Sequence, residues 1–195
     1  QTSEEKLSRF FRPVESLEGL VGRREELSKI MRILCRQQKN NALLAGGRGV
    51  GKNAVVRGLA WLLETGEVPA KLKDSILIEL NISALLSGTQ YRGDLEGRVQ
   101  EIMEAVRSEG DIIVYVSELR SLGGSGKMDD GAKDILNLLT PYFKSGDIKF
   151  IISATPEEIK KSSANDSGVL ALFRQVDIDE PTDEEDEDEE DFGEE

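Results

Sequence analysis

A glycine-rich stretch with a lysine is the part of this chain best suited to chemistry. Residues 46–53 read GGRGVGKN, which follows the phosphate-binding pattern G-x-x-x-x-G-K-[ST] up to Lys52 and departs from it at Asn53. Glycines let backbone N–H groups turn toward phosphate oxygens, and Lys52 adds a positive charge. The Ser or Thr hydroxyl normally ligates Mg²⁺, and the longer Asn53 amide replaces it here. The sequence therefore predicts phosphate binding beside a weakened metal site.

A second change falls on the same metal. Further along, the apolar run IIVYV (112–116) ends in Ser117-Glu118. In ATPases with such a loop this strand ends in Asp-Glu, where the Asp holds Mg²⁺ and the Glu polarises the attacking water. Glu118 keeps the catalytic type of residue, whereas Ser117 replaces the carboxylate. Asn53 and Ser117 are thus the candidate ligands of a weak or lost Mg²⁺ site.

Apolar runs alternate with helical patterns and place both motifs at the ends of strands. The runs 40–45, 75–80, 111–116 and 147–153 are typical of buried strands, and QVDI (175–178) of a last short strand. Helices are predicted over 52–66, over 94–108, where Leu95, Val99, Ile102 and Val106 share one face, and around 130–143. This alternation predicts an α/β fold, a parallel five-stranded sheet with helices on both faces.

Composition excludes several classes of function. The chain has 195 residues with one cysteine and no histidine, so an internal disulfide and histidine-based metal sites or acid–base chemistry are excluded. No apolar run approaches the length of a transmembrane helix, and the start QTSEEKLSRFF lacks the apolar region of a signal peptide.

The negative charge is concentrated at the end of the chain. Residues 177–195 contain 14 acidic residues and no basic ones, so the net charge of −13 leaves a body of +1. We expect either a disordered solubilising tail or a docking segment for a basic partner. The body has no basic stripe, so nucleic acid is not an expected partner. The expected organisation is an N-terminal extension (1–18), a nucleotide-binding domain (19–181) and an acidic disordered tail (182–195).

The motifs and their order resemble the first AAA+ nucleotide-binding domain of the ClpA/ClpB/ClpC protein-unfolding chaperones. LVGRREEL (20–27) resembles the segment that packs near the adenine, and residues 36–60 resemble the block around the P-loop. TGEVPAKLKD (65–74) resembles a connector and SGTQYRGDLEGRV (87–99) the first pore loop, while 117–155 follows the Walker B, second pore loop and sensor-1 stretch. The resemblance covers roughly residues 11–181 and implies the large subdomain of a P-loop NTPase.

The resemblance also implies roles for individual residues. ATP or ADP is the implied cofactor, with Mg²⁺ weakly bound or absent. Thr155 matches sensor 1, although Pro156 replaces the neighbouring family threonine. Tyr91 stands where an aromatic residue grips substrate polypeptide, and a half-buried loop tyrosine is the alternative interpretation. The implied nucleotide contacts are Val21, Gly22, Gly46, Arg48, Gly49, Val50, Gly51, Lys52, Asn53 and Ala54, and the implied substrate or partner loop is Tyr91, Arg92 and Gly93.

Departures from the family pattern argue against turnover. Ala171 and Leu172 occupy the places of two family arginines that reach the neighbouring subunit's nucleotide, and Arg48 replaces a proline. Loss of such a trans arginine costs roughly 10³ to 10⁵ in rate. The acidic tail begins where the family continues into a helical lid. We therefore expect Glu118 to be vestigial, and we expect neither a homo-hexamer nor useful hydrolysis by the isolated chain.

Three functions stay open at this point. The first is a catalytically degenerate Clp-like AAA+ domain that serves as a regulatory or structural subunit, beside active Clp-type subunits or in another assembly. The second is a slow or partner-activated Clp-type ATPase in protein unfolding and quality control. The third is a switch that binds ATP without hydrolysis. Gln1 is not an initiator, so a soluble organellar protein (plastid stroma or mitochondrial matrix) is expected, with the bacterial cytoplasm as the alternative.

Overall fold

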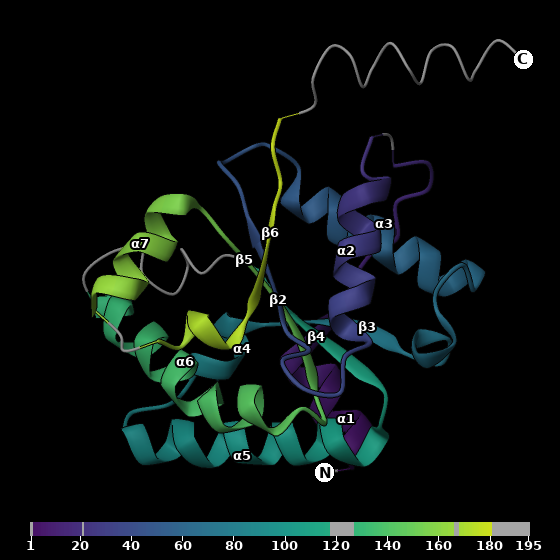
Figure 1. Cartoon of the computed structure of the whole chain (residues 1–195). Coiled ribbons are helices and arrows are strands. Elements are labelled where there is room, and N and C mark those ends of the chain that lie inside the picture. Colours follow the sequence, from purple (N-terminus) through teal and green to yellow (C-terminus); the bar gives the residue numbers. More distant parts are fainter. Residues whose placement is uncertain (1, 21, 118–126, 166–167, 181–195) are drawn as a thin grey trace, which may run out of the picture.

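A six-stranded sheet lies at the centre of the computed structural model, which describes residues 2–20, 22–117, 127–165 and 168–180 (Figure 1). The strand order is β1-β3-β4-β5-β2-β6. The neighbours from β3 to β6 pair in parallel, whereas β1 pairs with β3 in antiparallel fashion, with Phe11 opposite Leu80. The strands are β1 (Phe11–Pro13), β2 (Ala42–Ala45), β3 (Ile76–Leu80), β4 (Ile112–Val116), β5 (Lys149–Ala154) and β6 (Arg174–Asp177). The parallel part confirms the predicted α/β fold, and β1 adds an edge strand that the sequence pattern did not indicate.

Helices cover both faces of the sheet. Figure 1 shows α2 and α3 on one side and α6 and α7 on the other. The helices are α1 (Ser3–Phe10), α2 (Arg24–Leu34), α3 (Lys52–Thr65), α4 (Ile82–Leu86), α5 (Arg92–Glu109), α6 (Lys127–Ser145) and α7 (Pro156–Asn165), with short 3₁₀ turns η1 (Ala70–Leu72) and η2 (Leu170–Leu172). None of the helices in the described part of the chain combines the length and the apolar composition needed to cross a membrane.

Alternation along the strands builds two apolar cores. On β4, Ile113 and Tyr115 face the core beneath α2 and α3, and Ile112, Val114 and Val116 face the core beneath α5 and α6. The predicted face of α5 is confirmed, because its four apolar residues, Leu95, Val99, Ile102 and Val106, are all buried in the second core. The P-loop helix α3 and the helix α5 therefore lie on opposite faces of the sheet.

The first residues of the chain pack onto this body. Thr2 caps α1 in a capping box, in which its side chain accepts from the Glu5 N–H and the Glu5 side chain accepts from the Thr2 N–H. Phe10 and Phe11 are buried in the same core as α5. Residues 3–13, which the sequence assigned to an extension, thus supply a helix and an edge strand to the domain.

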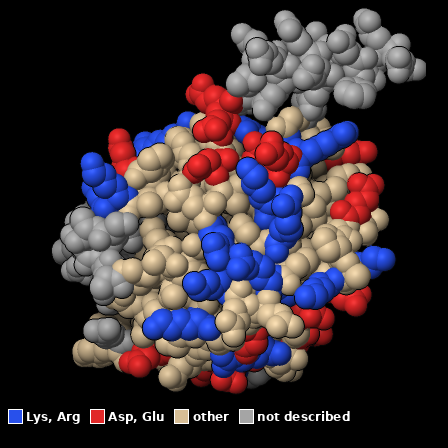
Figure 2. Space-filling view, in the orientation of Figure 1, with Lys and Arg blue, Asp and Glu red and all other residues tan. Residues whose placement is uncertain are grey.

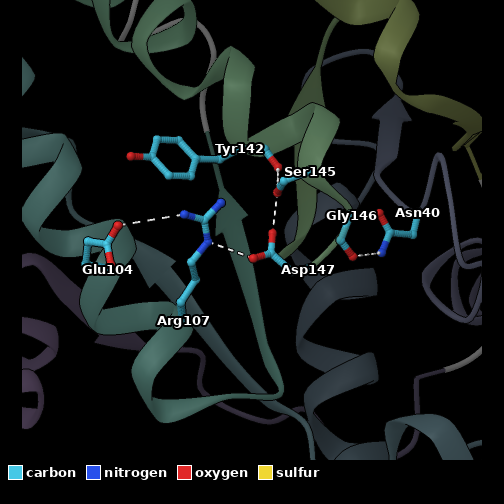
Figure 3. A network of polar contacts seen from close by, with 7 residues as sticks. All are labelled: Asn40, Glu104, Arg107, Tyr142, Ser145, Gly146 and Asp147. Carbon is cyan, nitrogen blue, oxygen red and sulfur yellow. Dashed lines mark hydrogen bonds and ion pairs between the residues drawn. The ribbon is translucent and has the colours of Figure 1, made fainter.

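A polar network joins α5, α6 and the start of β5 (Figure 3). Arg107 Nε donates to Asp147 Oδ2 at 2.7 Å, and its guanidinium lies 4.9 Å from the centre of the Tyr142 ring. Burial raises the pKa of Asp147, but the hydrogen bonds from Ser145 and Arg107 and the Arg107 charge outweigh it, and the pKa lies below its ordinary value. This network fixes the turn that leads from α6 into β5.

Candidate nucleotide-binding site

The loop between β2 and α3 has the backbone of a phosphate cradle. β2 is buried along its whole length, and the chain turns through Gly49 (φ 80°) and Gly51 (φ 100°), both left-handed, before α3 begins at Lys52. Among the described residues, the N–H groups of Arg48, Gly49 and Gly51 donate to no backbone carbonyl. They therefore remain available to an anion at the N-terminus of α3.

Gly46 is required by crowding rather than by its backbone angles. A Cβ atom at this position would lie 2.5 Å from the Ile178 carbonyl oxygen and 2.7 Å from Val50 Cγ2. The Gly46 N–H donates to Ala154 O at 3.1 Å, and Ile178 N–H donates to Ala45 O at 2.7 Å. The start of the loop is thus fixed between the ends of β5 and β6.

Lys52 lies against the loop that precedes it. Its ammonium group donates to the carbonyl oxygens of Gly46 and of Gly47, the latter at 2.9 Å. Burial lowers the pKa of Lys52, and the charge of Glu158 partly opposes this effect. A phosphate would offer this ammonium group stronger acceptors than the two carbonyls, because hydrogen bonds between charged groups are the stronger ones.

The segment before α2 is attached to the same loop. Gly22 has a left-handed backbone (φ 78°), and the next residue, Arg23, is 4% exposed. Arg23 Nη2 donates to Val50 O at 2.7 Å, and Nη1 lies 3.8 Å from Glu26 Oε1. This segment therefore braces the loop from outside the sheet. The neighbouring predicted contact, Val21, lies outside the described residues.

Asn53, in the first turn of α3, is bonded to the sheet. The hydroxyl of Tyr115 on β4 donates to Asn53 Oδ1 at 2.5 Å and lies 3.1 Å from Ser153 Oγ on β5. Tyr115 and Ser153 are 2% and 6% exposed, whereas Asn53 is itself exposed, so the first bond joins a surface amide to a buried hydroxyl. The oxygen with which Asn53 could ligate a cation already accepts a hydrogen bond. Ala54 follows in the same helical turn and is half-buried.

Ser117, after β4, is bonded in a comparable way. Its hydroxyl donates to Glu79 Oε1 on β3, and Glu79 Oε2 lies 3.5 Å from Arg12 Nε. Within the described residues, no group of three or more Cys, Asp or Glu side chains could hold a metal ion, and Glu118 lies outside them. The Asn53 oxygen accepts from Tyr115, the Ser117 hydroxyl donates to Glu79, and the P-loop hydroxyl and Walker B carboxylate of the family are both replaced, so the side chains at Asn53 and Ser117 do not fit the metal that the fold family implies.

Thr155 lies beside the phosphate loop. The two positions at which the family has arginines carry uncharged residues in this chain. Thr155 Oγ1 accepts from the Glu158 N–H at 3.2 Å and caps α7, immediately after Ala154, whose carbonyl is bonded to Gly46. Ala171 and Leu172 are in η2, before the buried Phe173. The structure thus brings the predicted sensor-1 residue to the phosphate end of the sheet.

Tyr91 belongs to another part of the surface. It is the N-cap of α5 and is 73% exposed rather than half-buried, with Arg92 and Gly93 as the first residues of the helix. Since α5 and α3 cover opposite faces of the sheet, this predicted substrate or partner loop is separate from the phosphate loop.

Sequence reasoning missed the partners of Asn53 and Ser117. Tyr115 is the one hydroxyl in the run IIVYV, and Glu79 is the one charged residue in the run SILIEL. A buried tyrosine hydroxyl and a carboxylate within a sheet both require partners, so these interruptions of two apolar strands were the available signal. Nothing in the sequence indicated which partners they would find.

The fold and the loop together define an AAA+ nucleotide-binding domain of the Clp and Hsp104 type. The chain belongs to the family described as the SMAX1 nucleotide binding domain, whose profile matches residues 17–141.

Relatives and solved structures agree with this assignment. The chain is 39% identical over 170 residues to chaperone protein ClpB of Clostridium perfringens, covering 87% of this chain and 20% of that protein. It is 36% identical over 166 residues to a ClpA homolog protein of Fuscovulum blasticum, covering 85% of this chain and 21% of that protein. The chain thus spans about a fifth of the length of these curated relatives.

Among solved structures, a closed state of Hsp104 with ATPγS and casein matches with a TM-score of 0.78 and 27% identity, over 92% of this chain and 31% of that one. An S. cerevisiae Hsp104–ADP complex matches with a TM-score of 0.74 and 28% identity, over 92% of this chain and 26% of that one.

Proposed function

We propose that this chain is a Clp-like AAA+ domain that binds an adenine nucleotide without turning it over and acts as a regulatory or structural subunit of a larger protein assembly. The observation that carries the proposal is a contrast between the backbone of the loop and the side chain that follows it. Its backbone keeps the phosphate-binding geometry, while the side chain at the metal position, Asn53, is bonded to Tyr115. The solved Hsp104 relative in complex with ADP supports an adenine nucleotide as the ligand.

Loss of turnover is expected because hydrolysis requires positive charges that this chain does not supply. Metal charge and trans charge stabilise the transition state of phosphoryl transfer. Asn53 and Ser117 replace the residues that would hold the metal ion, so its charge is lost. Ala171 and Leu172 are uncharged and therefore supply no trans charge. The retained loop, with Lys52, needs neither to hold phosphates. A role as a subunit that contacts protein partners therefore suits this chain better than an ATP hydrolysis cycle of its own. A homo-hexamer is not proposed, and an organellar location stays a prediction.

A nucleotide titration followed by a turnover assay tests this proposal. ADP and ATP should bind with measurable heat in a calorimeter, and phosphate release with Mg²⁺ should not exceed background. A Mg²⁺-dependent rate well above background would overturn the loss of turnover. Absence of binding would remove the nucleotide and leave a purely structural subunit.

A slow or partner-activated ATPase is the second candidate. It is favoured by Thr155, which lies beside Gly46 at the sensor-1 place, and by Lys52, which keeps its place in the loop. Under this alternative, adding an active Clp-type AAA+ subunit would raise phosphate release above the sum of the separate rates. Under the main proposal, the mixture would show only the partner's own rate.

A further inference from the structure

We propose that this site takes its adenine nucleotide free of Mg²⁺, because hydrogen bonds within the protein hold the groups from which the metal would be bound. The inference rests on the nucleotide binding proposed above and concerns the form of the ligand. The inference follows from two side-chain clusters at the ends of neighbouring strands and from the positively charged side chains of the loop.

The first cluster removes the ligand on the helix side. Asn53 Oδ1 accepts from the Tyr115 hydroxyl, which also lies within hydrogen-bond distance of Ser153 Oγ. The cluster joins α3, β4 and β5 around a tyrosine that is 2% exposed. Turning the Asn53 oxygen toward a cation would give up the hydrogen bond that it accepts from Tyr115. The amide therefore positions the first turn of α3 without a metal.

The second cluster removes the ligand on the strand side. Glu79 and Tyr115 are partners in the register of β3 and β4, so their side chains leave the sheet on the same face. One Glu79 oxygen accepts from Ser117 and the other faces Arg12 at 3.5 Å. A divalent cation at this carboxylate would have to compete with a guanidinium that already balances its charge. The side chains at both places from which the family binds the metal thus make hydrogen bonds within the protein.

Positive charge for the phosphates comes from the chain instead. Arg48 is exposed within the loop, between Gly47 and Gly49, and Lys52 lies at its end. The partial positive charge of the α3 N-terminus adds to these two full charges. These positive charges can balance the phosphates of a nucleoside diphosphate or triphosphate that carries no metal ion.

The test compares affinities with and without the metal on the full chain. The dissociation constants of ADP and ATP would be measured by calorimetry in excess MgCl₂ and in excess EDTA. We expect the two conditions to agree within about twofold. Tightening by Mg²⁺ of about tenfold or more would overturn this inference and leave nucleotide binding in place. No binding under either condition would overturn both.

Variants separate the clusters from the loop. Restoring Asn53→Thr with Ser117→Asp should create a preference for Mg²⁺ of about tenfold or more. Tyr115→Phe should weaken metal-free binding, and Ser153→Ala, which opens the same cluster more mildly, gives a second reading if Tyr115→Phe does not fold. Tyr142→Phe is the matched control, because it removes one phenol hydroxyl from α6 on the other face of the sheet.

Two further results would contradict the inference. Metal-free affinity that is unchanged in Tyr115→Phe and in Ser153→Ala would show that the cluster does not position the loop. A Mg²⁺ effect in the unmodified chain that disappears in Glu79→Gln would place a metal on the Glu79 carboxylate and overturn the inference directly.

Discussion

Gly46 lies where the phosphate loop leaves β2, and its surroundings leave room only for hydrogen. The nearest atom to an added Cβ belongs to the backbone of Ile178, so it cannot move aside by changing a rotamer. The glycine that a phosphate-binding motif requires is here also a packing residue, because the chain after β6 passes directly against it. The stability of the fold and the proposed phosphate binding therefore both depend on Gly46.

Gly46→Ala should destabilise the fold by about 1–3 kcal/mol, the usual cost of overpacking. Urea unfolding followed by circular dichroism measures this. Gly47→Ala is the matched control, because its Cβ would meet only Val50 Cγ1 at 3.9 Å and neither glycine has a positive φ. Equal unfolding midpoints for the two variants would contradict the packing argument.

Asp147 gives the fold a dependence on acid that can be assigned to one carboxylate. Its pKa is lower in the folded chain than the ordinary value of 3.8, so its stabilising effect is complete above that value and is lost as pH falls through the folded pKa. Asp147→Asn should cost about 0.2–1 kcal/mol at neutral pH, because water screens this half-exposed pair.

The measurement for Asp147 is urea unfolding of both proteins at neutral pH and at a pH well below 3.8. The difference in unfolding free energy should vanish at the acidic end. Glu104→Gln serves as a control, since that carboxylate is 72% exposed and lies 3.8 Å from Arg107 Nη1. A difference that persisted in acid would exclude the Asp147 charge as its cause.

At the scale of elements, Asn41 joins three parts of the fold ahead of β2. It is fully buried, donates to Phe143 O at 2.8 Å and accepts from Phe150 N–H at 3.1 Å. Its own carbonyl accepts from Arg174 N–H at 2.8 Å, at the start of β6. One side chain thus connects the end of α6 to β5, and its backbone connects the same point to β6.

Asn41→Ala should destabilise the domain by at least about 2 kcal/mol, because it leaves a buried carbonyl and a buried N–H unpaired. Asn40→Ala is the comparison. Among the residues that the structure describes, the Asn40 side chain makes one bond, to Gly146 O at 2.8 Å (Figure 3), and its buried Oδ1 has no partner there. Its loss should cost about 1 kcal/mol or less. Thermal and urea unfolding should rank the two variants in this order, and the reverse order would contradict the argument.

The parallel strands and the helices α3, α5 and α6 were predicted, because their apolar residues recur at strand or helix spacing, whereas α1, α2, α4 and α7 were not. The five parallel strands and the face of α5 follow from runs of apolar residues at strand and helix spacing. The edge strand β1 did not follow, because three residues that include Pro13 carry no period, and their pairing with β3 is a long-range contact. At the site, the backbone cradle was predictable from GGRGVGKN. The bond from Tyr115 to Asn53 was not, because it joins residues 62 positions apart.

At the scale of the whole molecule, the folded body and the acidic end differ sharply in charge. The body carries both signs, and Figure 2 shows Lys and Arg across the middle of one face with Asp and Glu mostly around its edges. Residues 182–195 contain 11 acidic residues and no basic ones. We therefore expect a basic partner to bind the end of the sequence rather than the body.

Replacing those 11 acidic residues with their amides should weaken binding of poly-L-lysine by roughly tenfold or more at low salt. The salt dependence of binding should fall with it, because fewer charges are screened. Fluorescence anisotropy with labelled polymer, repeated at increasing NaCl, measures both. The urea midpoint and the ADP affinity should stay unchanged, since residues 182–195 contain neither the apolar runs of the strands nor the phosphate loop. Undiminished binding of the polymer by the amide variant would place the basic partner on the folded body, and the acidic end would then have only a solubilising role.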